Sequence, residues 1–143
     1  MLPIMKNCFL VKPTKNLLAL KIIYLGSAIC WTLLIAFLCL GSFSNLPSLG
    51  IGGADKYIHI TFHFGFTILW FLFFFEAKID TRNPILKVFV SSILYGILIE
   101  IAQEFFTTTR KADLYDVLAN TAGAIIAILL IHAFVAWQKR KYN

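Results

Sequence analysis

Composition places this chain of 143 residues in a lipid environment. Hydrophobic residues make up 59% of it, charged residues only 14%, and its mean hydropathy is +0.81. A water-soluble domain of this size cannot bury so much apolar surface, which excludes an ordinary soluble enzyme or binding domain. The formal net charge of +6 does not indicate nucleic-acid binding, because the Lys and Arg residues lie at the edges of apolar runs.

Four apolar runs are each long enough to cross a bilayer, which takes roughly 20 residues. They cover residues 17–40, 57–77, 85–106 and 114–137. Backbone N–H and C=O groups find no water in hydrocarbon, so each run is expected to form a helix. The sequence therefore predicts an all-α fold, a bundle of four transmembrane helices.

One membrane domain is expected, covering residues 17–137 between a cytoplasmic N-terminal tail of residues 1–16 and a basic cytoplasmic tail of residues 138–143. The first apolar run is not expected to be a cleaved signal peptide, because its apolar core is too long and no small-residue cleavage site follows it. The connectors between runs are short and rich in turn-forming residues. The three cysteines show neither a metal-binding nor a disulfide spacing.

Basic residues predict the orientation, because cytoplasmic flanks of membrane helices carry an excess of Lys and Arg. Ten of the 13 positive charges lie before or at the start of the first helix, between the second and third helices, or after the fourth. Both termini are therefore predicted to be cytoplasmic. The chain is expected to be a multi-pass protein of the cell inner (cytoplasmic) membrane.

Most of the seven acidic residues are then expected at the outer end of the bundle. With about 100° of rotation and about 1.5 Å of rise per residue, the polar groups of the second, third and fourth helices each share one face and lie at similar depths. The sequence thus predicts one polar pocket that opens outward. Its expected members are Asp55, Lys56, His59, Glu100, Gln103, Arg110, Asp113, Asp116 and Asn120.

Glu100 is the deepest acid of this set. An ionisable group within the membrane costs roughly 2.5–3.5 kcal/mol on insertion scales, which favours a functional role over chance. The structural alternative is a salt bridge to Lys56 or Arg110 that only holds the helices together. Gln103 and Asn120 could equally serve as hydrogen-bonding contacts between helices.

Other polar and small residues of the second and fourth helices also have structural interpretations. Asp55 and Asp116 begin helices, where a carboxylate can cap free N–H groups. Ala119, Gly123 and Ala127 recur every four residues, a spacing that allows helices to approach closely. We interpret these three residues as helix packing.

A metal site is one further possibility. His59 and His63 lie one turn apart and could bind zinc together with Glu100 and Glu104, because imidazole and carboxylate groups suit this ion. A histidine within a membrane more often finds a hydrogen-bond partner. We therefore expect no metal and no cofactor.

Three short motifs follow one another along the second, third and fourth helices. They are DKYIH at 55–59, IEIAQ at 99–103, and DVLANTAGA at 116–124 preceded by Arg110 and Asp113. In order and spacing they resemble the VanZ-like family of small bacterial membrane proteins, and the likeness spans residues 55–130. The resemblance implies the fold and the site, and a link to tolerance of teicoplanin-type glycopeptides.

We expect the pocket to bind an amphiphilic molecule of the cell envelope, such as an envelope lipid or lipid-linked precursor, or a protein partner. One alternative is a membrane enzyme that uses the Glu, Asp and His groups on an envelope lipid. Whether a reaction occurs stays open, because the cluster holds no Ser or Cys nucleophile. A second alternative is a structural subunit of a membrane assembly. The bilayer is an expected partner, nucleic acid is not, and the oligomeric state is left open.

Overall fold

The computed structural model describes residues 17–41, 53–77, 83–107 and 111–142. Within these ranges the chain forms four α-helices and no strand. The helices are α1 (Leu17–Leu40), α2 (Ala54–Glu76), α3 (Pro84–Phe106) and α4 (Leu114–Tyr142). Each contains a span long and apolar enough to cross a membrane. The predicted all-α bundle of four transmembrane helices is confirmed, and the chain is a multi-pass membrane protein.

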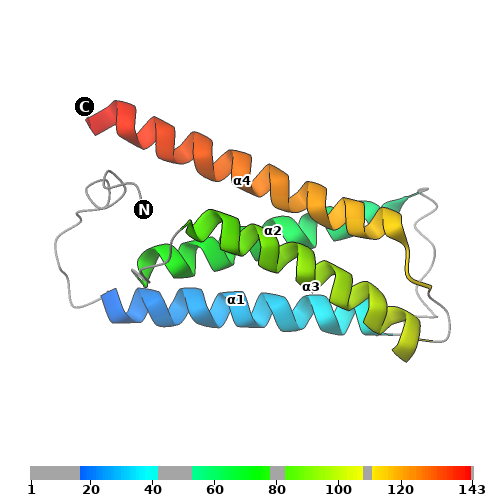
Figure 1. Ribbon diagram of the computed structural model, residues 1–143. Helices are drawn as coiled ribbons and strands as arrows, with labels where there is room; N and C mark the ends of the chain where they lie inside the picture. The colour runs from blue at the N-terminus through cyan, green and yellow to red at the C-terminus, as the bar shows by residue number, and fades with distance from the viewer. Residues whose placement is uncertain (1–16, 42–52, 78–82, 108–110, 143) are drawn as a thin grey trace.

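The four helices run side by side, with α2 and α3 between α1 and α4 (Figure 1). Helices α2 and α3 each pack against the three other helices, whereas α1 and α4 each pack against α2 and α3. The start of α1 and the end of α4 lie at the same end of the bundle. Helix α4 is inclined to the others, so that its C-terminal half diverges from them, and Ile131 is its last buried residue in the described range.

Helix α4 continues beyond the expected run of 114–137 as far as Tyr142. The added turn is basic, and Lys141 places its ammonium nitrogen 5.5 Å from the ring centroid of Trp137. A cation over an indole face is favourable, and a long basic side chain can follow the helix surface toward water. The helix therefore extends into the segment expected to be a basic tail.

Large apolar side chains cover the outside of the bundle. Those exposed include Leu18, Ile22 and Phe37 on α1, Leu94 and Leu98 on α3, and Leu129 and Leu130 on α4. A soluble monomer rarely exposes apolar surface on this scale, whereas acyl chains solvate it in a bilayer. The exterior is thus built to face lipid.

Polar contacts between aromatic side chains and the backbone join α1 to α2 and α3. The Trp31 indole N–H donates to the Phe62 carbonyl at 2.9 Å. The Tyr95 hydroxyl donates to the Thr32 carbonyl at 2.5 Å, and the Tyr95 ring stacks on Phe66 with centroids 5.2 Å apart. Hydrogen bonds between membrane helices contribute about 0.6 kcal/mol each on average. Together they fix the rotation of α1 and α3 about α2.

Helices α2 and α4 make backbone contact at Gly123. A Cβ atom added there would lie 2.2 Å from the backbone oxygen of Ile60, far inside any permitted separation. Ala119 and Ala127, one turn to either side on α4, are also buried. Small residues at this spacing let two helix backbones approach closely. Only glycine fits at the central position.

We expect Gly123→Ala to force α2 and α4 apart and to lower the free energy of unfolding by about 1–3 kcal/mol or more, the usual cost of overpacking. Gly26→Ala on α1 is the matched control, because an added Cβ there would meet nothing within 4 Å. It should be neutral or slightly stabilising, since alanine is the better helix former. Thermal unfolding of both variants in detergent measures the difference, and equal unfolding temperatures would contradict the close contact.

Candidate functional site

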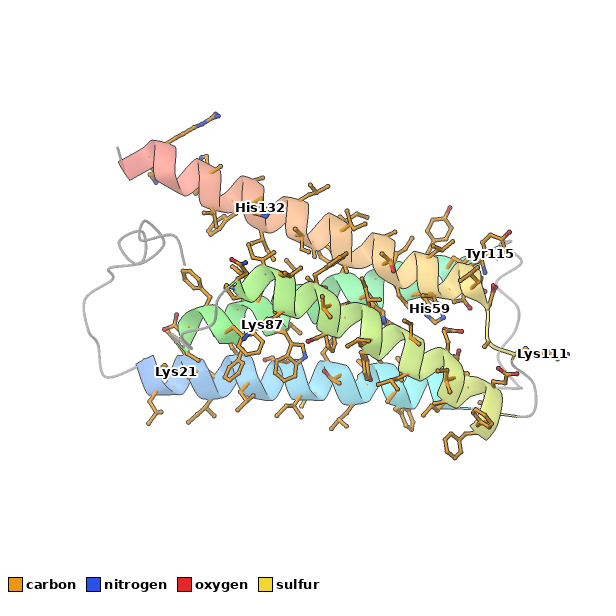
Figure 2. All side chains as sticks on the ribbon, viewed as in Figure 1. Lys21, His59, Lys87, Lys111, Tyr115 and His132 are labelled. Carbon is orange, nitrogen blue, oxygen red and sulfur yellow. The ribbon has the colours of Figure 1, made fainter. Side chains whose placement is uncertain are left out.

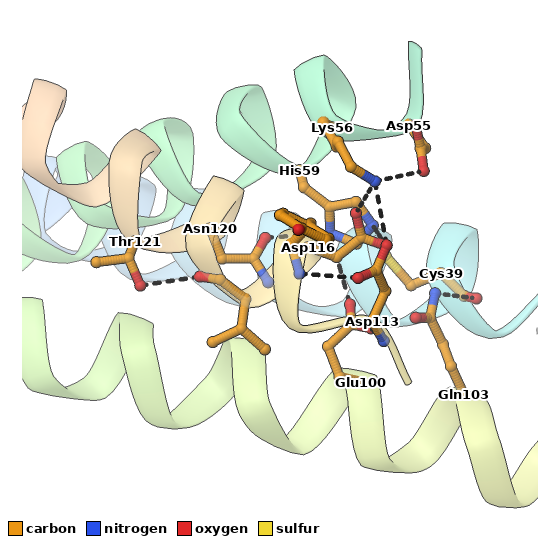
Figure 3. Close-up of polar contacts among 12 residues, drawn as sticks. Cys39, Asp55, Lys56, His59, Glu100, Gln103, Asp113, Asp116, Asn120 and Thr121 are labelled. Carbon is orange, nitrogen blue, oxygen red and sulfur yellow. Dashed lines mark hydrogen bonds and ion pairs between the residues drawn. The ribbon is translucent and has the colours of Figure 1, made fainter. Parts of the chain in front are cut away.

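Polar side chains from α2, α3 and α4 meet at the end of the bundle away from the start of α1 and the end of α4. Figure 2 shows His59 and Tyr115 toward this end and Lys21 toward the other. Four of the polar residues are buried: His59 is 3% exposed, Glu100 2%, Asp116 8% and Asn120 1%. We call these four residues the buried cluster. Figure 3 shows them facing one another, with Asp55, Lys56 and Asp113 beside them.

Lys56 holds three carboxylates at the edge of the buried cluster. Its ammonium group donates to Asp55 at 3.2 Å, to Asp113 at 3.2 Å and to Asp116 Oδ1 at 3.1 Å. The Lys56 side chain is 36% exposed and that of Asp116 12%, so the ion pairs lead from the surface into the bundle. Exposed ion pairs contribute little individually. Their role here is to hold the first turns of α2 and α4 together.

Asp113 caps the N-terminus of α4. Its carboxylate accepts the Tyr115 N–H at 2.8 Å, which is the usual geometry of an aspartate cap. The structure thus places the cap at Asp113, and not at Asp116 as the sequence allowed. The Tyr115 N–H, with help from the Lys56 ammonium, holds the pKa of Asp113 below its usual value. The stability that the ionised cap contributes is therefore lost only as the pH falls through this lowered pKa.

His59 lies between the two carboxylates of the buried cluster. Its Nδ1 is 3.1 Å from Asn120 Oδ1 and 3.9 Å from Glu100 Oε1, and its Nε2 is 3.7 Å from Asp116 Oδ2. In the tautomer with the proton on Nδ1, this nitrogen donates to the Asn120 amide oxygen, which can only accept a hydrogen bond. In the neutral ring the lone pair of Nε2 then faces Asp116.

Glu100 has one bonded and one free carboxylate oxygen. Oε2 accepts the backbone N–H of Asp113 at 3.3 Å. Oε1 is buried and has no hydrogen-bond partner among the described residues, and the same is true of Asn120 Nδ2. An unsatisfied buried polar group costs about 1–3 kcal/mol, so native proteins contain few of them. Two such atoms in one cluster mark it as a place where a further polar group can be received.

Gly96 of α3, which belongs to none of the sequence motifs, makes room for the buried cluster. A Cβ atom at this position of α3 would lie 2.8 Å from Asn120 Nδ2 and 3.1 Å from the His63 ring. Glycine therefore leaves the space in which the Asn120 amide reaches His59. The only sign of this role in the sequence is a glycine inside the third apolar run. The sequence does not show which side chain from another helix occupies the space beside that glycine.

Two predicted pocket members lie outside this network. The Gln103 amide is buried, but it donates to the Cys39 carbonyl of α1 at 3.0 Å. Gln103 thus joins α3 to α1, which is the structural alternative considered for it. Arg110 lies outside the described residues.

The four-residue zinc set considered from the sequence is not assembled. His63 Nδ1 is 2.8 Å from the Ser92 hydroxyl of α3, and both side chains are fully buried. Glu104 is exposed. The sequence did not reveal the pairing with Ser92, because one apolar run contains two adjacent serines and their rotation relative to α2 depends on packing. A different set, His59, Glu100 and Asp116, lies close together instead.

Comparison with known proteins identifies the chain. It matches the VanZ/LLP1 family over residues 4–135, which is most of its length. No curated protein and no solved structure shows significant similarity to it. The match covers all three segments that build the buried cluster, and the four helices are each apolar enough to span a bilayer. The chain is therefore a multi-pass membrane protein that belongs to the VanZ/LLP1 family.

Proposed function

We propose that this protein resides in the cell inner membrane and binds the polar headgroup of an amphiphilic envelope molecule at the buried cluster. The observation that carries the proposal is the free Oε1 of Glu100, which is buried and has no hydrogen-bond partner among the described residues. Retaining a carboxylate in this state is expensive unless another molecule uses it. An envelope lipid or lipid-linked precursor can supply that group while its tail lies along the apolar exterior.

The free atoms favour a headgroup with hydroxyl groups. Glu100 Oε1 is an acceptor without a donor, and Asn120 Nδ2 is a donor without an acceptor, within the described part of the chain. A hydroxyl group both donates and accepts, so a sugar or glycerol headgroup can satisfy both atoms. Binding of such a molecule would connect this protein to the envelope and to the tolerance of teicoplanin-type glycopeptides that the family resemblance implies.

A membrane enzyme is the second candidate. His59 lies within 3.9 Å of carboxylates from two different helices, an arrangement that can hold and release a proton. No Ser, Thr or Cys side chain takes part in the buried cluster among the described residues. A reaction here would therefore proceed by acid–base chemistry on an activated water or substrate hydroxyl, and not through a covalent Ser, Thr or Cys intermediate.

Glu100→Gln should abolish binding and spare the fold. Glutamine keeps the shape and the acceptor for the Asp113 N–H, and it removes a buried charge, so stability should hold or rise. Binding is measured as the envelope lipids that co-purify with the protein, by mass spectrometry, beside teicoplanin susceptibility of a sensitive host that expresses each variant. We expect the native chain to retain a hydroxyl-rich lipid and raise tolerance, and Glu100→Gln to lose both.

Gln103→Leu on the same helix is the matched control. It breaks the hydrogen bond to Cys39 outside the buried cluster, at a cost of about 0.6 kcal/mol, and should retain the lipid. If Glu100→Gln instead lowers abundance and unfolding temperature in step with tolerance, the cluster only locks the bundle. Retention of the lipid by Glu100→Gln would refute the proposed site.

We also propose that both termini are cytoplasmic and that the buried cluster lies near the outer surface. The positive charges of Lys21, Lys87, Arg140 and Lys141 support this, because all four lie on the helix segments at the end away from the cluster. Cytoplasmic flanks are enriched in such residues. In this orientation these four charges stay on the cytoplasmic side and need not cross the bilayer during insertion.

Cysteine labelling tests this orientation. In a Cys8→Ser background, Lys111→Cys should react with a membrane-impermeant maleimide in intact spheroplasts, because Lys111 is exposed beside the cluster. Lys141→Cys, also exposed, should react only after the membrane is opened. The reverse pattern would place the cluster on the cytoplasmic side.

A further inference from the structure

We propose that His59, Glu100 and Asp116 bind one divalent transition-metal ion of the Zn²⁺ type. Each residue offers one ligand atom, and these atoms all lie within 4.8 Å of one another. The residues come from α2, α3 and α4, and all are buried. Zinc bonds of about 2.0–2.2 Å in tetrahedral geometry separate two ligand atoms by about 3.4 Å. The 3.7 Å between His59 Nε2 and Asp116 Oδ2 is already close to that separation.

Each of the three side chains has one polar atom held and one left free. Asp116 Oδ1 accepts from Lys56, Glu100 Oε2 accepts from the Asp113 N–H, and His59 Nδ1 donates to Asn120. The atoms left over are Asp116 Oδ2, Glu100 Oε1 and His59 Nε2. A side chain that binds a metal ion through one atom is commonly held in place by a hydrogen bond to its second polar atom. Asp116 Oδ2 lies 3.7 Å from His59 Nε2, whereas Glu100 Oε1 lies nearest to Nδ1 of the same ring, at 3.9 Å. Zinc on Nε2 would therefore require the Glu100 side chain to turn toward Nε2.

The free oxygen of Glu100 is an observation independent of the grouping itself. Oε1 is buried and lacks a hydrogen-bond partner among the described residues. In the neutral His59 ring, the Nε2 lone pair also faces a carboxylate oxygen at 3.7 Å, which is too long for a hydrogen bond and electrostatically unfavourable. A cation bound here would give Glu100 Oε1 a partner. It would also replace the repulsion between His59 Nε2 and Asp116 Oδ2 with attraction of both atoms to the ion.

Charge balance also favours a cation. Asp55, Asp113 and Asp116 all pair with the Lys56 ammonium, which can neutralise only one of them, and Glu100 pairs with no Lys or Arg among the described residues. A divalent ion would offset the two carboxylates that lie deepest. Imidazole with carboxylate oxygens suits zinc better than magnesium, which prefers oxygen ligands alone. Three protein ligands leave a fourth position open, as in catalytic zinc sites.

This inference concerns the same site as the proposed function and modifies it: with Glu100 Oε1 bound to zinc, a headgroup hydroxyl would bind zinc at its open fourth position and not Oε1 itself. It is tested without any envelope molecule, so either proposal can fail alone. The full chain is purified in detergent through a tag without histidine and stripped with a chelator. Zinc is then titrated while bound metal is measured by mass spectrometry and thermal unfolding is recorded, with manganese and magnesium in parallel.

The native chain should bind one zinc per molecule and unfold at a higher temperature with zinc than without it. Asp116→Asn should bind zinc at least about tenfold more weakly, since even partners of metal ligands change affinity by 10–100-fold. Glu104→Gln is the matched control, because Glu104 is an exposed carboxylate of α3 outside the three ligands, and its affinity should be unchanged. Equal affinity in all three proteins, or an unfolding temperature that does not respond to zinc, would overturn the proposal.

X-ray absorption of the native zinc complex does not depend on whether any variant folds. The expected zinc environment is nitrogen and oxygen at about 2.0–2.2 Å with the scattering of one imidazole. A sulfur ligand, or zinc surrounded by water alone, would refute the site.

Discussion

The backbone contact between Gly123 and Ile60 is the constraint on which the rest of the site depends. Ile60 follows His59 on α2, and Gly123 lies one turn beyond Asn120 on α4. Because the two backbones touch there, with a notional Cβ only 2.2 Å from the Ile60 oxygen, the short Asn120 side chain can reach the His59 ring. A wider separation would leave the Asn120 amide and the His59 imidazole without this hydrogen bond inside the membrane. Burying polar groups without a hydrogen bond lowers stability.

The polar groups of the bundle fall into two kinds that differ in how well they are satisfied. His63 with Ser92, toward the centre of the bundle, and Gln103 with the Cys39 carbonyl, near the ends of α3 and α1, form closed pairs that tie helices together. In the buried cluster, the Glu100 carboxylate retains a free oxygen among the described residues. A satisfied hydrogen-bonded pair between two helices favours one arrangement of those helices. The free oxygen of Glu100 contacts no partner and therefore does not have this role. Thr67 Oγ1 on α2 also has no hydrogen-bond partner among the described residues, so what marks Glu100 and Asn120 as available for binding is a free acceptor and a free donor in one cluster.

Much of the architecture follows from the sequence, because bilayer thickness and backbone hydrogen bonding leave few options for an apolar run. Helical phase also indicated which polar residues share a face and a level. It could not show that Gln103 turns toward α1, or that His63 pairs with Ser92, because these depend on helix rotations set by packing. The role of Gly96 was likewise hidden, since the space beside a glycine is defined by a neighbour from another helix.

The divergence of α4 from the bundle divides this helix into two parts with different mutational tolerance. From Ala119 to Ala127 its inward face admits only small side chains, because α2 lies against it. Between Ile131 and the basic last turn no described side chain of α4 is buried, so apolar residues of different shapes would serve in this stretch. In related proteins, the residues of this stretch of α4, which follows the position of Ile131, should therefore differ widely in identity while remaining apolar. A sequence signature for this fold should end near the point where α4 leaves its neighbours.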